Sequence, residues 1–212
     1  MAHIVLLGDS IFDNAPYVRE GMAVSDHLRA CLGPQERVTL LARDGDVLDD
    51  MPAQFAALAR LPEAPTQLVV SCGGNDVLGW LGALQTGVGS VLDALALLSQ
   101  WQHTFGQRYR RMLDGAQAVG LPLAVATIYD AVPGLAPGML SALALFNDVI
   151  LREAVLRGLP VLDLRVVCTE PGDYAACSPI EPSEAGGRKI AAALAALWSG
   201  QGALRSVLHG PA

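Results

Sequence analysis

Features of several protein classes are missing from this chain of 212 residues. No run of basic residues is longer than the pair Arg110-Arg111, and the formal net charge is −7 at pH 7. An acidic surface argues against nucleic acid as a partner, because binding the phosphate backbone needs basic side chains. No apolar run reaches the ~18 residues that a membrane-spanning helix needs, so we expect no membrane span. The opening Met1-Ala2-His3 has no charged region and no cleavage site of the secretory kind, so we expect no secretory signal.

Metal and nucleotide motifs are missing as well. The cysteines, Cys31, Cys72, Cys168 and Cys177, form no Cys-x-x-Cys pair, and no His lies at metal-ligand spacing from them. Neither a Gly-x-Gly-x-x-Gly run after a strand nor a Walker A motif occurs. We therefore expect no metal site and no cofactor. The cysteines are interpreted as free thiols in a reducing compartment, which predicts a cytoplasmic location. In an oxidising compartment, Cys168 and Cys177 would close a short loop.

The chain does contain a regular alternation of short apolar runs and longer helical stretches. With 52% hydrophobic residues it is long enough for one sizeable core, so we expect a single domain over 1–200 and a tail over 201–212. Strands are expected at 3–7, 37–42, 67–72, 121–127 and 159–163, and helices at 17–31, 48–60, 88–118, 138–157 and 183–198. The alternation predicts an α/β fold, a three-layer α/β/α sandwich with about five parallel strands in the flavodoxin-like order 2-1-3-4-5.

Polar residues follow the first three expected strands. Gly8-Asp9-Ser10 follows the first, Gly45 the second and Gly74-Asn75-Asp76 the third. Ligands bind at this edge of open parallel sheets, and acyl transfer needs a nucleophile together with donors aimed at the developing oxyanion. Ser10 would be the nucleophile, with the Gly45 amide and the Asn75 side chain as donors. The alternatives are a Ser that hydrogen-bonds its own turn and an Asn-Asp pair that caps the following segment.

This set of motifs resembles the SGNH/GDSL hydrolase family, in the same order and over most of the chain. Gly8-Asp9-Ser10 is similar to the family's nucleophile block, and Gly45 to the block whose amide donates to the oxyanion. Gly74-Asn75-Asp76 is similar to the block whose Asn side chain donates to the same oxyanion. The resemblance implies a hydrolase with a Ser nucleophile that acts on a small carboxylic ester.

The last motif departs from the family pattern. Where the family has Asp-x-x-His-Pro, this chain has Ser178-Pro-Ile-Glu181-Pro. A carboxylate with a pKa of ~4.3 accepts a hydroxyl proton poorly unless burial raises that pKa. Glu181 is therefore a base with a raised pKa, a structural carboxylate near the start of the last helix, or an ion-pair partner of Arg165 or Arg43.

None of the four histidines is a good replacement for the missing imidazole. His3 lies at the opposite end of the first strand, ~23 Å from Ser10 at extended rise. His27 lies late in the first helix, which runs away from the site, and His209 lies in the tail. His103 is expected on a helix surface, although its segment would be able to swing over the site.

Further residues are expected to bind substrate, namely Asp9, Asp13, Asp76, Trp80 and Ser178. Trp80 would line an acyl pocket or pack in the core or a lid. The Gly-rich segment 79–89 and the loop 131–138 are candidate walls or lids of the site.

Three functional hypotheses follow from these residues. The first is a small-ester esterase whose partner is a small molecule. The second is a catalytically impaired relative that binds a small ligand in the inherited pocket. The third is a flavodoxin-like domain with unrelated chemistry, because fold alone does not fix function.

Overall fold

A five-stranded parallel sheet forms the centre of the computed structural model, which describes residues 2–18 and 20–199. The strands are β1 (His3–Gly8), β2 (Arg37–Leu40), β3 (Gln67–Ser71), β4 (Leu123–Ala126) and β5 (Val161–Leu162). Their order, β2-β1-β3-β4-β5, confirms the predicted order. Every residue of the interior strand β1 is buried, as expected for a parallel strand covered on both faces. The tail predicted over 201–212, which includes His209, lies outside the described residues.

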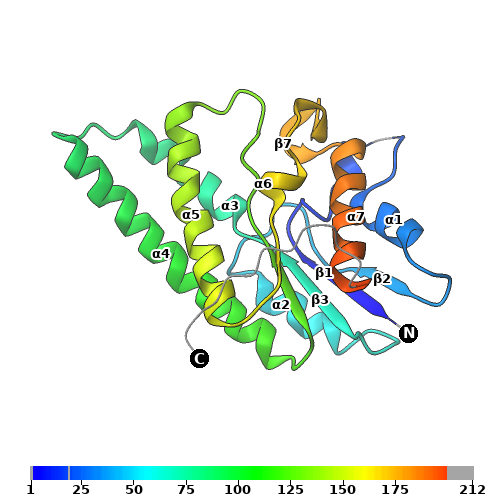
Figure 1. The fold of residues 1–212 in the computed structure, drawn as a ribbon. Coiled ribbons are helices and arrows are strands. Elements are labelled where there is room, and N and C mark those ends of the chain that lie inside the picture. The colour runs from blue at the N-terminus through cyan, green and yellow to red at the C-terminus, as the bar shows by residue number, and fades with distance from the viewer. Residues whose placement is uncertain (1, 19, 200–212) are drawn as a thin grey trace.

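Helices cover both faces of the sheet and make it the middle of three layers (Figure 1). Helices α1 (Val24–Cys31) and α7 (Glu184–Ser199) pack on one face, whereas α2 (Met51–Leu58), α4 (Val91–Ala118) and α5 (Pro137–Leu156) pack on the other. Successive side chains of β1 point to opposite faces. Ile4 and Leu6 accordingly join the core under α1 and α7, and Val5 and Leu7 join the core under α2, α4 and α5.

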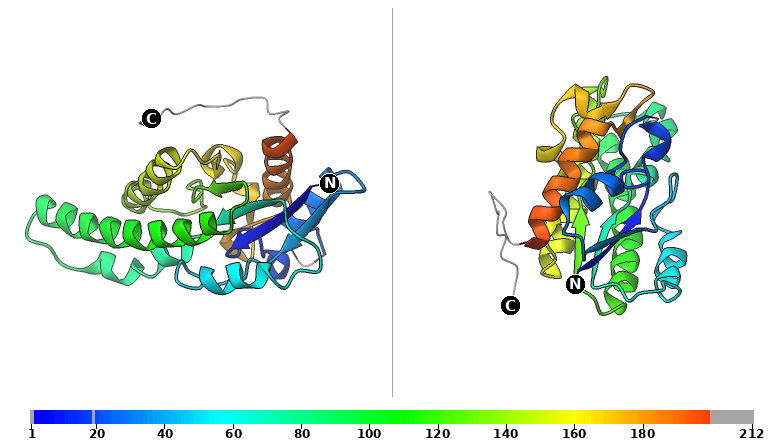
Figure 2. Two further views of the ribbon diagram at one scale, coloured as in Figure 1. Left: turned by 90° about the horizontal axis from the view of Figure 1, so that it is seen from below. Right: turned by 90° about the vertical axis from the view of Figure 1, so that its right-hand side faces the viewer.

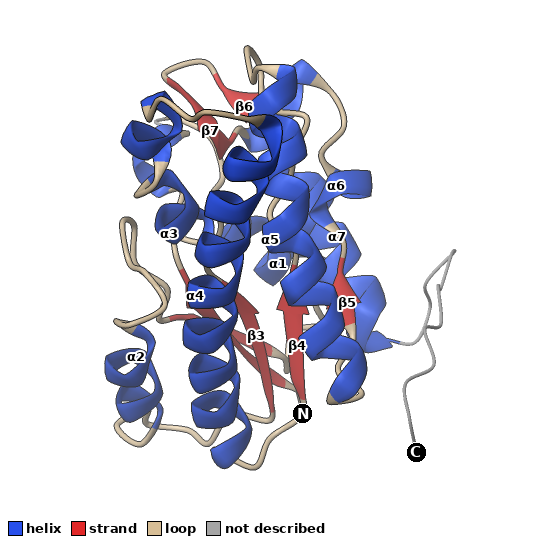
Figure 3. Ribbon diagram, turned by 90° about the vertical axis from the view of Figure 1, so that its left-hand side faces the viewer, coloured by secondary structure: helices blue, strands red, loops and turns tan. Residues whose placement is uncertain are grey.

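Shorter elements stand at the carboxyl edge of the sheet, where the sequence suggested loops. They are η1 (Ala15–Tyr17), α3 (Gly74–Leu78), η2 (Leu81–Gln85), α6 (Leu164–Val167), η3 (Pro171–Asp173), β6 (Tyr174–Ala175) and β7 (Ser178–Pro182). Strands β6 and β7 pair antiparallel and lie on the side of the sheet toward which the parallel strands point (Figure 3). The Gly-rich segment 79–89 is thus partly helical, and the strand that carries Glu181 was not anticipated because its partner is only two residues long.

The first predicted helix, 17–31, begins later than expected. Helix α1 starts at Val24, and residues 15–17 form the separate turn η1. Two side chains fix the later start, because the Val24 amide donates to Asn14 Oδ1 at 2.9 Å and the Ala23 amide donates to Asp26 Oδ2 at 3.2 Å. Such side-chain acceptors satisfy the free amides of a helix N-terminus.

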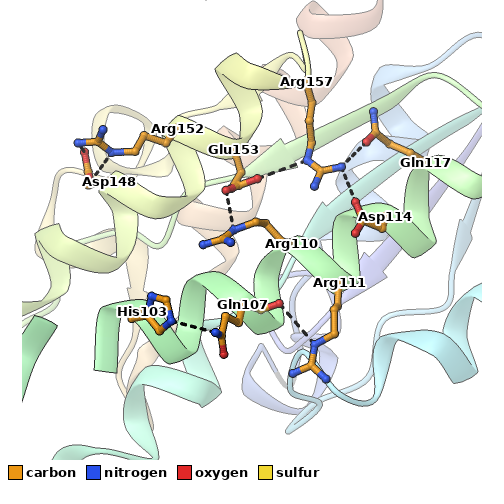
Figure 4. A network of polar contacts seen from close by, with 10 residues as sticks. All are labelled: His103, Gln107, Arg110, Arg111, Asp114, Gln117, Asp148, Arg152, Glu153 and Arg157. Carbon is orange, nitrogen blue, oxygen red and sulfur yellow. Dashed lines mark hydrogen bonds and ion pairs between the residues drawn. The ribbon is translucent and has the colours of Figure 1, made fainter. Parts of the chain in front are cut away.

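Helices α4 and α5 lie side by side, run parallel to each other and reach beyond the sheet (Figure 2). A polar network joins their surfaces (Figure 4). Glu153 of α5 pairs with Arg110 of α4 at 2.9 Å, and Arg157 of α5 pairs with Asp114 of α4 at 2.7 Å. Over the described ranges, no helix is long and apolar enough to cross a membrane.

Candidate active site

Ser10 lies immediately after β1, in a turn that only glycine permits. Gly8 has φ +125°, and a Cβ at this position would lie 1.8 Å from the backbone oxygen of Ser71. The Asp9 amide donates to that same oxygen at 3.1 Å, which holds the turn against β3. The turn continues with the Ile11 amide donating to Asp9 Oδ1 at 3.1 Å. The nucleophile candidate is therefore held by the neighbouring strand, and only 6% of its surface is exposed.

A buried glutamine that the sequence analysis missed joins this turn to the next one. Gln54 of α2 accepts from the Gly8 amide at 2.8 Å and donates to the Gly8 carbonyl at 2.7 Å. Its Nε2 also donates to Asp46 Oδ2 at 2.7 Å. Asn75 completes the connection, because its Nδ2 donates to the Asp46 carbonyl at 3.0 Å. The only available signal was a polar residue within the apolar run Met51-Pro-Ala-Gln-Phe-Ala-Ala-Leu58.

The loop that contains Gly45 is fixed against the Ser10 turn. The Arg43 amide donates to the Gly8 carbonyl at 3.0 Å, and the Asp44 amide donates to Asp13 Oδ2 at 2.9 Å. Gly45 itself has φ +85° and is exposed. Within the part of the chain that the structure describes, the backbone amides of Ser10 and Gly45 have no hydrogen-bond acceptor. Both amides are therefore available to an incoming anion.

Glu181 of β7 is buried and interacts with Ser10. Burial raises the pKa of its carboxyl from 4.5 to about 7, a hydrogen bond with the Ser10 side chain opposes the rise, and the negative charge of Asp44 adds to it. Its Oε2 is buried without a hydrogen-bond partner among the described residues. The strand is anchored beside it, because the Tyr129 hydroxyl donates to the Ile180 carbonyl at 2.5 Å. Glu181 is thus a carboxyl whose proton affinity suits exchange near neutral pH.

Two further carboxyls lie in the same buried region. Burial raises the pKa of Asp9 to about 8, the Ile11 amide opposes this, and the charges of Glu181 and Asp76 add to it. Burial also raises the pKa of Asp76, against the effects of the Leu48 amide and Arg108. Asp76 is paired, with Arg108 Nη1 2.7 Å from its Oδ1. Of the three carboxyls, Asp9 has the strongest tendency to remain protonated at pH 7.

A largely apolar pocket with a cavity of about 120 Å³ opens next to Ser10. Its polar lining comes from Asp9, Ser10, Ser71, Asn75, Thr127 and Glu181. Its apolar wall is built mainly by α3, η2, α4 and α5, and includes Val77, Leu78, Trp80, Leu81, Leu84, Leu98, Trp101, Met139, Leu143 and Phe146. The Trp80 ring stacks against Trp101 and Phe146, with centroid separations of 6.1 and 5.3 Å. An apolar cavity with a few convergent polar groups is the usual form of a small-molecule site.

The structure brings some of the predicted site residues together and places others nearby. Ser10, Asn75, Glu181, Asp9 and Trp80 line the pocket. The remaining residues, Gly45, Asp13, Asp76 and Ser178, lie outside its lining. Gly45 and Asp13 belong to the two joined turns, Asp76 is held by Arg108, and Ser178 is half-buried at the start of β7.

No histidine that the structure describes lines the pocket. His3 is buried, with its Nε2 2.8 Å from Thr39 Oγ1. His27 is buried in α1, and His103 is exposed on α4, 2.8 Å from Gln107. Across residues 2–18 and 20–199, no cluster of three or more His, Cys, Asp or Glu side chains is arranged to hold a metal ion. All four cysteines are unpaired.

Comparison with known proteins agrees with this arrangement. The GDSL-like Lipase/Acylhydrolase family matches residues 6–189. Among solved structures, an acetyl xylan esterase from Geobacillus stearothermophilus has a TM-score of 0.71 at 16% identity and covers 97% of each chain. A lipase from a goat rumen metagenome has a TM-score of 0.70 at 14% identity, covering 93% of this chain and 97% of its own.

An α/β hydrolase from the metagenome of Lake Arreo, Spain, has a TM-score of 0.68 at 20% identity, covering 95% of this chain and 97% of its own. No curated protein matches the chain. At these identities the structural likenesses show the fold, whereas the family match spans most of the sequence and all the motifs from Gly8 to Glu181. The chain therefore belongs to the GDSL-like lipase/acylhydrolase family.

Proposed function

We propose that this protein is a serine esterase that hydrolyses small carboxylic esters, with Ser10 as its nucleophile. The observation that carries the proposal is the meeting of the Ser10 hydroxyl and the Glu181 carboxyl in a largely apolar pocket. An ester has no charge to satisfy, so an apolar pocket suits it. The structural neighbours that are named as an acetyl xylan esterase and a lipase support ester chemistry.

In the first half of the reaction, Ser10 Oγ attacks the ester carbonyl carbon while Glu181 takes the hydroxyl proton. The carbonyl π electrons move to the oxygen, which becomes the oxyanion of a tetrahedral intermediate. The Ser10 and Gly45 amides and the Asn75 side chain donate to this oxyanion, a stabilisation that typically amounts to ~3 kcal/mol per donor. The intermediate collapses when the bond to the alcohol oxygen breaks, and the alcohol leaves with the proton held by Glu181.

In the second half, water replaces the alcohol. Glu181 takes a proton from water as the water oxygen attacks the acyl-Ser10 carbonyl carbon. The same donors hold the second oxyanion, the bond to Ser10 Oγ breaks, and Oγ recovers its proton from Glu181. The products are a carboxylic acid and an alcohol, and the enzyme returns to its starting state.

Glu181 suits this role because of its surroundings rather than its residue type. Burial raises the pKa of the Glu181 carboxyl to about 7, so that this group can take up and release a proton near neutral pH. General-base catalysis is most effective when the pKa of the base lies near the working pH. The buried Oε2 without a partner leaves one oxygen of the carboxyl free to receive a proton.

The first test compares the wild type with Ser10→Ala on p-nitrophenyl acetate and butyrate. We expect the variant to lose most of the turnover, about a thousandfold or more, because the covalent intermediate is no longer formed. A fluorophosphonate probe provides a second readout, since labelling requires an activated nucleophile. Equal hydrolysis and equal labelling in both proteins would remove Ser10 from the mechanism.

A second candidate function is favoured by the lack of any described histidine in the pocket. Under this alternative the protein is a catalytically impaired relative that binds a small ester, acid or related ligand beside Ser10. The double variant Glu181→His with Ser178→Asp restores the family's usual residues at both positions. Activity in this variant together with an inactive wild type supports the ligand-binding function, and activity in the wild type supports the esterase.

Under either function the expected partner is a small molecule. The acidic net charge of −7 gives no support to nucleic acid binding. A cytoplasmic location is also proposed, on the sequence argument from cysteine usage alone.

A further inference from the structure

Most of the large apolar side chains that are exposed in the described structure gather on one arm of the molecule. We call this group the apolar rim; it consists of Leu81, Leu84, Val88, Val91, Leu92, Leu95 and Leu140. The rim covers η2, the start of α4 and the start of α5, which together project beyond the sheet (Figures 1 and 2). Val91 and Leu92 are 77% and 75% exposed. Exposed apolar patches that are contiguous in this way mark interaction surfaces.

The start of α4 lacks the polar face of an ordinary surface helix. Residues 91–98 read Val-Leu-Asp-Ala-Leu-Ala-Leu-Leu. A surface helix carries apolar residues along one stripe, whereas a helix that is apolar on all sides is normally covered. Asp93, the only charged residue of this segment, accepts from Ser90 at the helix start, so it does not make the opposite face polar. The exposed side chains Leu92 and Leu95 therefore have no counterpart in the packing of the monomer.

The rim continues directly into the pocket. Leu81 and Leu84 are exposed members of the rim and also line the pocket. On α5, Leu140 of the rim is next in sequence to Met139 of the pocket wall. A permanent protein partner on the rim would therefore cover residues at which substrate enters. A lipid layer that itself contains the substrate would cover the same residues without keeping the substrate from the pocket.

We propose that the apolar rim docks on the surface of an electrically neutral lipid layer, from which an apolar ester passes into the pocket. This proposal rests on the proposed esterase function for its substrate, but the docking is measurable without it. The charge distribution favours a neutral lipid surface, because Asp93 is the only charged residue in 80–98 and the whole chain carries a net charge of −7. Such a protein gains nothing from anionic headgroups and is repelled by them. The apolar area alone holds it, as in interfacial helices.

The test is co-flotation of the full chain with phosphatidylcholine vesicles. The Ser10→Ala variant is used so that no hydrolysis alters the vesicles. We expect this protein to float with neutral vesicles, and to float less when phosphatidylglycerol is mixed in. Adding Leu92→Gln and Leu95→Gln should lower the bound fraction by about tenfold, because two exposed leucines no longer enter the apolar phase. Glutamine keeps good helix propensity, so α4 is retained.

The matched control carries Leu156→Gln and Val166→Gln. These side chains are 62% and 73% exposed but lie outside the rim, so the control should float like its parent. Circular dichroism checks that each variant is folded, and Val91→Gln serves as a substitute if the double variant is not. The proposal is overturned if the parent does not float, or if rim and control variants float equally. It is also overturned if sedimentation shows a dimer that only the rim variant dissociates, because the rim would then be a contact between copies.

The results expected if the esterase proposal is wrong differ from those expected if the docking proposal is wrong. If only the esterase proposal fails, the wild type leaves dissolved p-nitrophenyl butyrate intact while flotation still depends on the rim. If only docking fails, dissolved butyrate is hydrolysed in a Ser10-dependent way and flotation is absent. The two measurements therefore separate the two proposals.

Discussion

The side-chain amide of Gln54 is hydrogen-bonded to both backbone polar groups of Gly8, at 2.8 Å from the amide nitrogen and 2.7 Å to the carbonyl oxygen. The same Nε2 also reaches Asp46 Oδ2, and Asp46 in turn accepts from Asn75 through its carbonyl. One residue of α2 thus connects the turn before Ser10 with the loop that contains Gly45. It touches neither substrate nor reacting atoms in the proposed mechanism, so its role would be to position the groups that do.

Replacing Gln54 by Leu should disturb both stability and catalysis. The change leaves the Gly8 amide buried without its acceptor, which costs roughly 1–3 kcal/mol of unfolding free energy. It also releases the turn that presents Ser10, and small misplacements of reacting groups lower kcat by up to about a hundredfold. Urea denaturation measures the first effect, and ester hydrolysis measures the second as a fall in kcat with little change in KM.

Gln117→Leu is the matched control, because Gln117 is exposed and its side chain bonds only Arg157 among the described residues. Its unfolding free energy should stay within about 0.5 kcal/mol of the wild type. A Gln54→Leu protein that keeps wild-type kcat would show that the connection is structural and does not position the nucleophile.

The raised pKa of the Glu181 carboxyl predicts how kcat/KM depends on pH. As the proposed base it acts when ionised, so kcat/KM should rise with pH through about 7, the pKa that burial gives this carboxyl. Glu181→Gln should remove this rise and lower kcat/KM by about 10²–10⁴-fold, the usual contribution of general-base catalysis. The neighbouring exposed Glu184 provides the control, and Glu184→Gln should keep the wild-type profile. A rise that persists in Glu181→Gln would assign the proton transfer to another group.

The raised pKa of the Asp9 carboxyl predicts how the unfolding free energy depends on pH. Its pKa is about 8 in the folded protein and near 3.8 when the chain is unfolded and exposed. Between these values the folded state holds a proton that the unfolded state has lost, so the unfolding free energy falls as pH rises from about 4 to about 8. Stability from this group is fully present below about pH 4 and is lost once pH exceeds the folded pKa.

Asp9→Asn should reduce this fall, because the amide stays neutral at every pH and still accepts from the Ile11 amide through Oδ1. The slope of unfolding free energy against pH should become less steep by up to about 1.4 kcal/mol per pH unit. Denaturant titrations at several pH values measure it. Asp148→Asn, at an exposed carboxylate paired with Arg152, should leave the slope unchanged. Identical slopes for wild type and Asp9→Asn would mean that Asp9 ionises normally in the folded protein.

The sequence predicted the sheet well because buried parallel strands are short apolar runs, as Ile4 to Leu7 shows. It also led to Ser10 and Asn75, which follow such strands and line one pocket. Gln54 was missed because its partners are backbone groups forty-six residues away in the chain, which residue type does not encode. The strand that carries Glu181 was missed because it pairs with only two residues, too few for a periodic pattern. Local composition therefore predicted the elements, while contacts between distant segments determined the surroundings of the site.

Two glycines of the site differ in what an added methyl group would meet, and this gives a paired prediction. At Gly8 a Cβ would lie 1.8 Å from the Ser71 backbone oxygen, inside the centre of the sheet where neither strand can move away. Gly8→Ala should therefore lower the unfolding free energy by more than about 4 kcal/mol or prevent folding. At Gly45 no atom lies within 4 Å of the added Cβ, so the cost is limited to the unfavourable φ of +85°, about 1–2 kcal/mol.

Gly45→Ala keeps the backbone amide that we propose as an oxyanion donor. Its esterase rate should therefore remain close to that of the wild type, while Asn75→Ala, which removes a side-chain donor, should lower kcat by about 10²–10³-fold. Thermal unfolding followed by circular dichroism compares the stability of Gly8→Ala with that of Gly45→Ala. Hydrolysis of p-nitrophenyl butyrate compares the activity of Gly45→Ala with that of Asn75→Ala. If Gly45→Ala folds normally but loses activity as fully as Asn75→Ala, the loop demands the conformation that only glycine adopts, and its geometry rather than its free amide limits the reaction.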